Sequence, residues 1–416
     1  MKISIVSLGC SKNLVDSELI LGSLTTSWHQ IADENEADVI IVNTCGFIGD
    51  AKRDSINTIL DLAEYKKSGS CKKLVVTGCL VERYASELRE ELPEVDAFWG
   101  TGSLSRIGEV LGDVPMNGEL RNPPGTIYDP DSPRVMLTAP HTAFVKVSEG
   151  CSRTCSFCII PKMRGLMRSR TIESIHGEVA ALAESGVREI NLIAQDMTSY
   201  GRDIGTDLEC LLRELSAVDK VEWLRIHYCY PWGVTDTLIE LISEKENILP
   251  YIDMPLQHIN DRLLRLMDRK TSSKRIRDIL ARLKSGLPGL TLRTTFIVGF
   301  PGETEEEFEE LLNFVEEAEF DRAGAFKYSR EEGTPAGQMS GQVPEDIIDA
   351  RYERFMEAQS EVSLRKNESL IGTVAKGFVE GDENGETYAR ISTQAPEVDG
   401  YTYIKSRKRL RPGDFI

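Results

Sequence analysis

The stretch Ala143-Phe-Val-Lys-Val-Ser148-Glu-Gly-Cys151-Ser-Arg-Thr-Cys155-Ser-Phe-Cys158 joins an apolar, strand-like run to three closely spaced cysteines. Clusters that only transfer electrons usually take four cysteines, and structural zinc sites also take four ligands. Three thiolates therefore indicate a four-iron cluster with one iron left open for an exogenous ligand. The alternative is a zinc loop that borrows a distant fourth ligand.

The cysteine loop belongs to a series of alternating strand-like and helix-like runs. Six alternations fit an α/β fold in which a partial (β/α)6 TIM-like barrel carries its site at the carboxyl ends of the strands. The loop follows the first strand, which is where such a site requires it. The strand-like runs are 143–148, 189–194, 223–230, 251–256, 291–298 and 323–328, and the helix-like runs include 174–185, 261–269, 273–284 and 305–317.

Three further cysteines, Cys10, Cys45 and Cys79, each follow a run that reads as a buried parallel strand. The strand-like runs are 2–9, 38–44 and 72–78, and the helix-like runs 14–24 and 51–66 lie between them. The carboxyl ends of parallel strands share one edge of a sheet, where open α/β sheets bind ligands. We therefore expect a second three-thiolate cluster; three small apolar core cysteines are the alternative.

The length of the chain and the proline-rich segment that interrupts it predict about three domains. The expected segments are 1–115, a proline-rich linker at 116–136, the barrel at 137–367 and a terminal segment at 368–416. Runs 370–379, 386–392 and 400–405 read as a short antiparallel β module, apparently incomplete. Pro123, Pro124, Pro130 and Pro133 lie in the linker.

Composition indicates an enzyme of a reducing compartment. The chain has 9 cysteines and a net charge of -18. It has no run long and apolar enough to span a membrane and no export signal, so we expect a cytoplasmic protein. Strong acidity disfavours nonspecific nucleic-acid binding and favours a basic partner.

A chain with two three-cysteine cluster sites, each of which leaves one iron without a protein ligand, resembles the radical S-adenosylmethionine (SAM) methylthiotransferase family. The aromatic Phe157 before the third cysteine is typical of radical SAM enzymes. The leader Ser7-Leu-Gly-Cys10-Ser-Lys-Asn-Leu-Val-Asp-Ser-Glu18 is similar to the branch called RimO, which modifies a ribosomal protein. The sister branch, MiaB, acts on an adenosine of transfer RNA.

The resemblance implies a fold, an activity and a set of ligands. The fold would be a flavodoxin-like parallel sheet domain, the radical SAM barrel and a small antiparallel TRAM domain of OB-like form. Cys151, Cys155 and Cys158 would hold the [4Fe-4S] cluster that binds SAM, and Cys10, Cys45 and Cys79 a second, sulfur-carrying [4Fe-4S] cluster. Two SAM molecules and a reductant such as flavodoxin would add a methylthio group to the β-carbon of an aspartate in protein twelve of the small ribosomal subunit.

Other polar residues follow predicted strands. Gln195 and Asp196 either line the SAM or substrate pocket or cap a helix. Gly299, Gly302 and Glu303 either approach the nucleoside of SAM or form a plain strand-to-helix turn. Four more residues have structural alternatives that we expect more often: His258 as a hydrogen-bonded residue, Asn13 and Asp16 as helix caps, and Arg164 as a solvated arginine.

Two other functions remain open on the sequence. One is a methylthiotransferase of transfer RNA adenosine with the same chemistry. The other is a noncatalytic iron–sulfur protein that binds RNA through its terminal module. That module carries a basic run from Lys405 to Arg411 but acidic and basic residues in equal number, which makes RNA contact weak.

Overall fold

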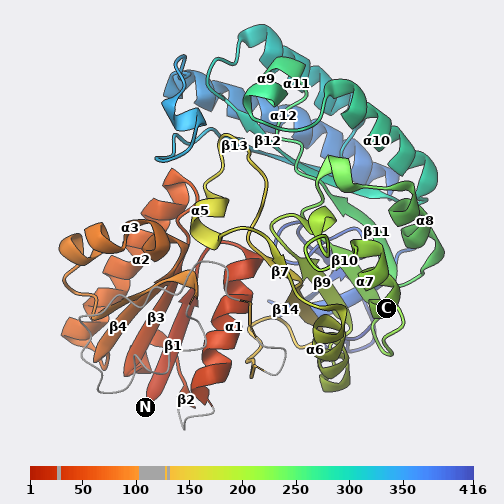
Figure 1. Ribbon diagram of the computed structural model, residues 1–416. Coiled ribbons are helices and arrows are strands. Elements are labelled where there is room, and N and C mark those ends of the chain that lie inside the picture. The colour runs from red at the N-terminus through yellow and green to blue at the C-terminus, as the bar shows by residue number, and fades with distance from the viewer. Residues whose placement is uncertain (26–29, 103–126, 129–131) are drawn as a thin grey trace.

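A computed structural model describes residues 1–25, 30–102, 127–128 and 132–416, and Figure 1 shows their arrangement. Most of the predicted linker lies outside the described residues. The predicted α/β class is confirmed: two parallel sheets with helices and one small antiparallel sheet follow one another along the chain. In the described parts of the chain, no helix is long and apolar enough to cross a membrane.

The N-terminal domain is a parallel sheet with helices on both faces. Its strand order is β2-β1-β3-β4-β5, the flavodoxin-like order, in which all strands are parallel and the direction in which successive strands are added changes between β1 and β3. Helix α1 packs on one face, and α2 and α3 pack on the other. The strands are β1 (Lys2–Ser7), β2 (Gln30–Ile31), β3 (Val39–Thr44), β4 (Lys73–Gly78) and β5 (Ala97–Trp99), and the helices are α1 (Ser11–Thr25), α2 (Gly49–Ser68) and α3 (Cys79–Glu91).

The middle of the chain forms a six-stranded parallel sheet of order β13-β12-β11-β10-β9-β6, so β6 and β13 lie at its two edges. This is the predicted partial barrel. Its strands are β6 (Thr142–Lys146), β9 (Glu189–Ile193), β10 (Trp223–Ile226), β11 (Ile248–Asp253), β12 (Thr291–Val298) and β13 (Arg322–Lys327). Its main helices are α6 (Ile172–Ser185), α7 (Leu208–Leu215), α8 (Asp236–Glu244), α9 (Asp261–Leu266), α10 (Ser273–Gly286), α11 (Glu305–Ala318) and α12 (Glu345–Ser369).

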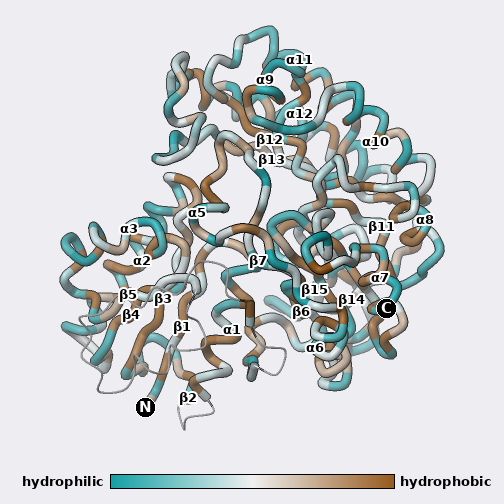
Figure 2. The backbone as a smooth tube through the Cα atoms, in the orientation of Figure 1, coloured by the Kyte–Doolittle hydropathy of each residue, from teal (hydrophilic) through white to brown (hydrophobic). Residues whose placement is uncertain are grey.

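Apolar residues are concentrated in the strands and on the inner faces of the helices, as the brown segments of Figure 2 show. Helices α6 to α11 each follow a residue whose side chain accepts a hydrogen bond from a free N–H group of the first turn. Thr304 and Glu307 form a reciprocal capping box at the start of α11, and Asn260 caps α9. These local signals fix where the barrel helices start and hold the strand ends in place.

The N-terminal domain closes one side of the barrel. Val15 and Leu19 of α1 pack against Phe144 and Ile193 of the barrel strands. In addition, the carboxylate of Glu331 lies 2.8 Å from Lys52 Nζ and 2.7 Å from an Arg83 nitrogen of the N-terminal domain. Apolar packing and ion pairs therefore fix the two domains against each other.

A terminal module, residues 377–416, packs against the start of the barrel strands. It contains β14 (Gly377–Glu383), β15 (Glu386–Ile391) and β16 (Thr402–Ile404), all antiparallel. Residues 413–416 also form backbone hydrogen bonds with β14. The ring of Phe378 lies 4.7 Å from that of Trp223 at the start of β10.

One predicted strand is wrong over most of its length. The apolar run 370–379 was expected to be extended, but α12 continues to Ser369 and β14 begins only at Gly377. The side chains of Ile371 and Val374 are 82% and 100% exposed. The prediction was based on apolar composition alone, but within the described residues no sheet covers this run.

Candidate active site

All six predicted cysteines line one cavity of about 500 Å³. The cavity lies where the carboxyl ends of the N-terminal strands face the carboxyl ends of the barrel strands. Residues from the loop 396–398 of the terminal module complete its wall. Three parts of the chain that are far apart in sequence therefore meet at one site.

The first triad comes from three neighbouring strands of the N-terminal sheet. Cys10 follows β1, Cys45 follows β3 and Cys79 begins α3 directly after β4. Gly9 has a φ of 92°, and a Cβ there would lie 2.8 Å from the Cβ of Cys45. A glycine is therefore needed for the first loop to bring Cys10 close to Cys45.

The second triad lies on the loop after β6. Gly150 has a φ of 82°, and a Cβ there would lie 2.4 Å from the carbonyl oxygen of Leu166. Further along the loop, Ser156 donates its hydroxyl to the Leu266 carbonyl at 2.7 Å and its amide to the Met267 carbonyl at 3.0 Å. Backbone contacts therefore hold the loop independently of any ligand.

Burial makes these thiols weak acids. It raises the pKa of Cys45 and of Cys158 to about 12 and that of Cys151 to about 11. Such thiols lose their protons when a metal binds them, because the metal stabilises the thiolate. The two triads also have cationic neighbours: Arg164 Nε lies 3.3 Å from Cys79 Sγ, and an Arg269 nitrogen lies 3.7 Å from Cys155 Sγ.

This donor set fits iron–sulfur clusters. Soft thiolates suit iron–sulfur clusters, and N–H groups that point at sulfur are the contacts that tune them. Within the described ranges, no three His, Cys, Asp or Glu side chains are arranged to hold one metal ion. The thiolates of a four-iron cluster bind separate irons, so their sulfurs stand further apart than the donors around a single zinc.

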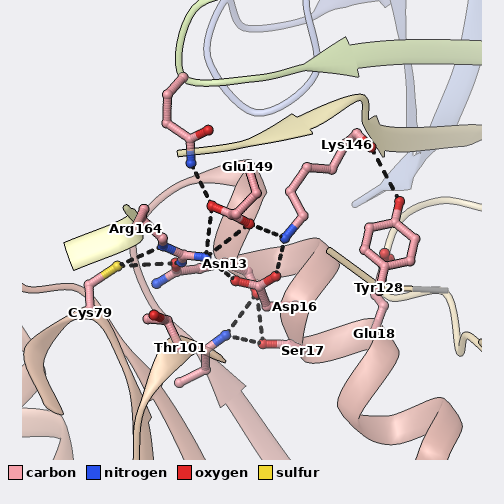
Figure 3. A network of polar contacts seen from close by, with 12 residues as sticks. Asn13, Asp16, Ser17, Glu18, Cys79, Thr101, Tyr128, Lys146, Glu149 and Arg164 are labelled. Atoms are coloured by element: carbon pink, nitrogen blue, oxygen red, sulfur yellow. Dashed lines mark hydrogen bonds and ion pairs between the residues drawn. The ribbon is translucent and has the colours of Figure 1, made fainter. Parts of the chain in front are cut away.

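A buried polar network joins Cys79 and α1 of the N-terminal domain to the barrel, and Figure 3 shows it from close by. The Arg164 guanidinium, on α5 (Ile160–Arg164), contacts Cys79 and lies 2.7 Å from an Asp16 carboxylate oxygen. Lys146 Nζ, at the end of β6, lies 2.6 Å from both Asp16 and Glu149. Despite burial, Lys146 and Arg164 lower the pKa of Glu149 to about 2. This ion cluster therefore binds α1 to the barrel.

Gln195 and Asp196 line the cavity, as one of their two interpretations expected. The Gln195 amide donates to Glu149 at 2.8 Å, and the Gln195 carbonyl oxygen is buried without a hydrogen-bond partner among the described residues. Asp196 pairs with Arg153 at 2.6 Å. A buried polar oxygen without a partner is rare in folded proteins and makes Gln195 a candidate for contact with a ligand.

Gly299, Gly302 and Glu303 lie outside the set of residues that line the cavity. The Glu303 carboxylate accepts the Gly299 amide at 2.7 Å and pairs with Arg351 at 2.7 Å. It also lies 3.2 Å from His258 Nε2, so the histidine has the hydrogen-bonded role that we expected. A nucleoside-binding role for this turn stays a prediction.

Sequence reasoning missed three contributors to the site. Asn13 and Asp16 were expected as helix caps and Arg164 as a solvated arginine, yet all three are buried in the interdomain network. Asn13 and Asp16 are three apart on α1 and therefore share a face, which was the available signal. Their partner Arg164 lies 148 residues from Asp16, beyond the reach of any local pattern.

Family comparisons cover most of the chain. Residues 2–100 match the family described as "Uncharacterized protein family UPF0004". Residues 145–315 match the "Radical SAM superfamily", and residues 371–416 match the "TRAM domain".

Among solved structures, the radical SAM methyltransferase TsrM from Kitasatospora setae superposes with a TM-score of 0.59, at 13% identity, over 81% of this chain and 76% of that one. The radical SAM enzyme OxsB gives a TM-score of 0.52 at 11% identity, over 87% and 56%. At these identities the likeness shows the fold alone.

Curated relatives are far more similar. The ribosomal protein uS12 methylthiotransferase RimO of Geobacter sulfurreducens is 50% identical over 97% of this chain and 92% of its own. The RimO protein of Pelotomaculum thermopropionicum is 48% identical over 100% of this chain and 95% of its own. With this identity over nearly its whole length, the chain belongs to the RimO family of ribosomal protein uS12 methylthiotransferases.

Proposed function

We propose that this protein adds a methylthio group to the β-carbon of an aspartate in ribosomal protein uS12, using SAM and two [4Fe-4S] clusters. One observation carries the proposal: two cysteine triads from two domains line the same cavity. A single triad would suffice for an ordinary radical SAM reaction. A second triad facing the first supports a reaction in which sulfur is also delivered.

Each part of the cavity has a proposed role. Cys151, Cys155 and Cys158 hold the cluster that binds SAM, and Cys10, Cys45 and Cys79 hold the auxiliary cluster. When bound, the SAM cluster supplies a carbon radical able to remove hydrogen from an unactivated carbon, which no side chain of the protein can do. The surrounding residues donate hydrogen bonds to the thiolates and exclude water.

The cavity walls favour such chemistry. Phe47, Phe144 and Phe157 contribute apolar surface, which keeps bulk water away from a reactive centre. Arg164 and Arg269 donate to Cys79 and Cys155 respectively. Gln195, whose side-chain oxygen has no hydrogen-bond partner among the described residues, lines the same cavity.

The protein partners follow from the same proposal. The net charge of -18 favours a basic ribosomal protein over RNA as the substrate. The chemistry needs a one-electron donor, for which we propose a flavodoxin. A substrate that is a ribosomal protein also places the reaction in the cytoplasm.

A direct test compares the two substrates left open by the sequence. Reconstituted enzyme with SAM, sulfide and reductant is incubated with a peptide of the uS12 loop or with a transfer RNA anticodon stem-loop. Mass spectrometry should detect a methylthio adduct on the peptide aspartate. An adduct on the RNA alone would contradict the proposal, and no 5′-deoxyadenosine at all would indicate a noncatalytic protein.

The triads can be separated by mutation. Changing Cys151, Cys155 and Cys158 together to alanine should abolish SAM cleavage but leave one cluster bound, because the Cys10 triad lies on a different domain. Iron and sulfide content should fall by about half. Complete loss of iron would show that the two sites do not load independently. The variant with Cys71 and Cys210 changed to alanine, neither of which lines the cavity, should keep both clusters.

A further inference from the structure

The six-cysteine cavity is lined by more cations than carboxylates, although the whole chain is acidic. Three of its arginines have carboxylate partners within 3.1 Å: Arg153 with Asp196, Arg164 with Asp16 and Arg293 with Asp253. Two cations, Lys12 and Arg269, have no carboxylate within ion-pair distance in the described part of the chain. These two cations are therefore available to an anionic ligand; among the described residues, the negative groups of the wall without an ion-pair partner are the thiolates, which bind the clusters, and Glu397.

Lys12 is held in an unusual setting. It is the second residue of α1, its side chain reaches from the N-terminal domain to the barrel, and the residue is only 8% exposed. Its Nζ lies 3.4 Å from the centre of the Tyr228 ring. A cation–π contact offsets only part of the free-energy cost of burying an ammonium without a counter-ion. An anion that enters the cavity would make up the difference.

The proposed reaction brings two carboxylates into this space, that of SAM and that of the target aspartate. Arg269 lies beside Cys155 of the SAM triad and stacks 4.1 Å from the Tyr230 ring. Arg269 therefore lies at the end of the cavity where we place SAM. Lys12 lies two residues after Cys10, at the end of the cavity that holds the auxiliary triad. The carbon that accepts the sulfur must lie near this triad.

We propose that Lys12 binds the carboxylate of the target aspartate and so positions its β-carbon between the two triads. This inference rests on the proposed function and deepens it, because it names the residue that selects the acidic side chain. Asp253, at the end of β11, is paired with Arg293 at 3.1 Å.

A buried ammonium selects by charge. Asparagine has nearly the shape of aspartate but leaves the Lys12 charge unpaired in the cavity. Losing one partner of a buried, hydrogen-bonded charge pair weakens binding by roughly 100-fold. The wild-type protein should therefore bind an aspartate peptide about 100-fold more tightly than the same peptide with asparagine.

The test is a cycle of two proteins and two peptides. Cluster-loaded wild type and Lys12→Met are titrated with fluorescent uS12-loop peptides that carry Asp or Asn at the target, without reductant, so that no turnover occurs. Lys12→Met should bind both peptides alike, near the affinity of wild type for the Asn peptide, while Lys12→Arg should retain most of the preference. Lys67→Met removes an exposed lysine of α2 that does not line the cavity and should behave as wild type.

Each result has one reading. Equal preference for the Asp peptide in wild type and Lys12→Met, or no preference in wild type, would overturn the role of Lys12. Iron content checks that Lys12→Met is loaded; if it is not, the same two peptides are titrated into Lys12→Gln, which keeps a polar side chain without the charge and should likewise lose the preference. Absence of methylthio product from wild type on the Asp peptide would instead overturn the proposed function.

Discussion

At the scale of single residues, Arg164 of the barrel contacts three buried residues of the N-terminal domain at once. Its guanidinium is buried and contacts the Cys79 sulfur, the Asp16 carboxylate and the amide oxygen of Asn13. Although burial alone would lower the pKa of Arg164, the negative charges around it raise that pKa well above its usual value. Because a guanidinium has five N–H donors in a plane, one arginine can serve all of these partners.

Replacing Arg164 should weaken the interface between the two domains. Arg164→Met keeps the length of the side chain but leaves Asp16 and Glu149 with only Lys146 as a cationic partner. The loss of one member of a buried ion cluster destabilises by about 3–5 kcal/mol. Thermal unfolding of the cluster-free protein should show a clearly lower midpoint.

The control for this prediction is Arg53→Met. Arg53 forms an exposed ion pair with Asp50 on α2, and such pairs contribute about 1 kcal/mol or less. Equal melting temperatures for Arg164→Met and Arg53→Met would contradict the role given to the buried network.

At the scale of elements, the loop between β15 and β16 reaches from the terminal module into the cavity wall. Asp399 accepts a hydrogen bond from the Tyr251 hydroxyl at 2.6 Å and from the Ala395 amide at 2.8 Å. Glu397 has a φ of 68°, a conformation that non-glycine residues adopt only when their surroundings hold it. Asp399 therefore fixes the loop that carries residues 396–398 to the cavity.

Loosening this loop should affect the substrate more than SAM. Asp399→Asn weakens a charge-assisted hydrogen bond, which contributes roughly 1.5–3 kcal/mol, so the KM for uS12 should rise about tenfold or more. Formation of 5′-deoxyadenosine without substrate should stay unchanged.

The control lies in the same module. Asp382→Asn alters an exposed aspartate of the β14–β15 turn, where Asp382 accepts the Gly385 amide, and should leave the KM unchanged. An unchanged KM for Asp399→Asn as well would show that the loop does not contribute to substrate binding.

At the scale of the whole molecule, the barrel is closed from two directions. The N-terminal domain covers the carboxyl ends of its strands, and the terminal module covers their starts. The second contact is built on Glu189, which pairs with Arg390 of β15 at 2.5 Å and with Arg225 of β10 at 3.2 Å. This buried ion cluster makes the terminal module part of the barrel.

Acid should loosen this contact. Burial would raise the pKa of Glu189, but Arg390 and Arg225 outweigh burial and lower it to about 2, from an ordinary value of 4.5. A carboxylate whose folded pKa is depressed stabilises the protein fully above its unfolded pKa, and that stability is lost as the pH falls towards the folded value. Thermal midpoints of the cluster-free wild type and Glu189→Gln should therefore differ most above pH 4.5 and converge towards pH 2.

The exposed Glu184, which pairs with Lys220, gives the matched control. Glu184→Gln should follow the wild-type midpoint at every pH. If the midpoints of wild type and Glu189→Gln differ by the same amount at pH 7 and at pH 2.5, Glu189 does not stabilise the contact by its charge.

Local patterns were sufficient for most strands of the molecule. The run predicted at 291–298 is β12 (Thr291–Val298), and the strands before Cys10, Cys45 and Cys79 lie within the predicted runs. Short edge strands such as β2 (Gln30–Ile31) were missed, because two residues carry no measurable periodicity.

The sequence by itself determined the parallel strands, the cysteines at their ends and the chemistry that three thiolates imply, because each of these depends on spacing along the chain. Only the tertiary structure decided that the two triads share one cavity, that Arg164 meets Asp16 there and that Lys12 reaches the Tyr228 ring. Periodicity reports which face of an element is buried, but not which charge from another domain lies against it. That choice depends on packing between segments more than a hundred residues apart, where a buried charge must find its partner.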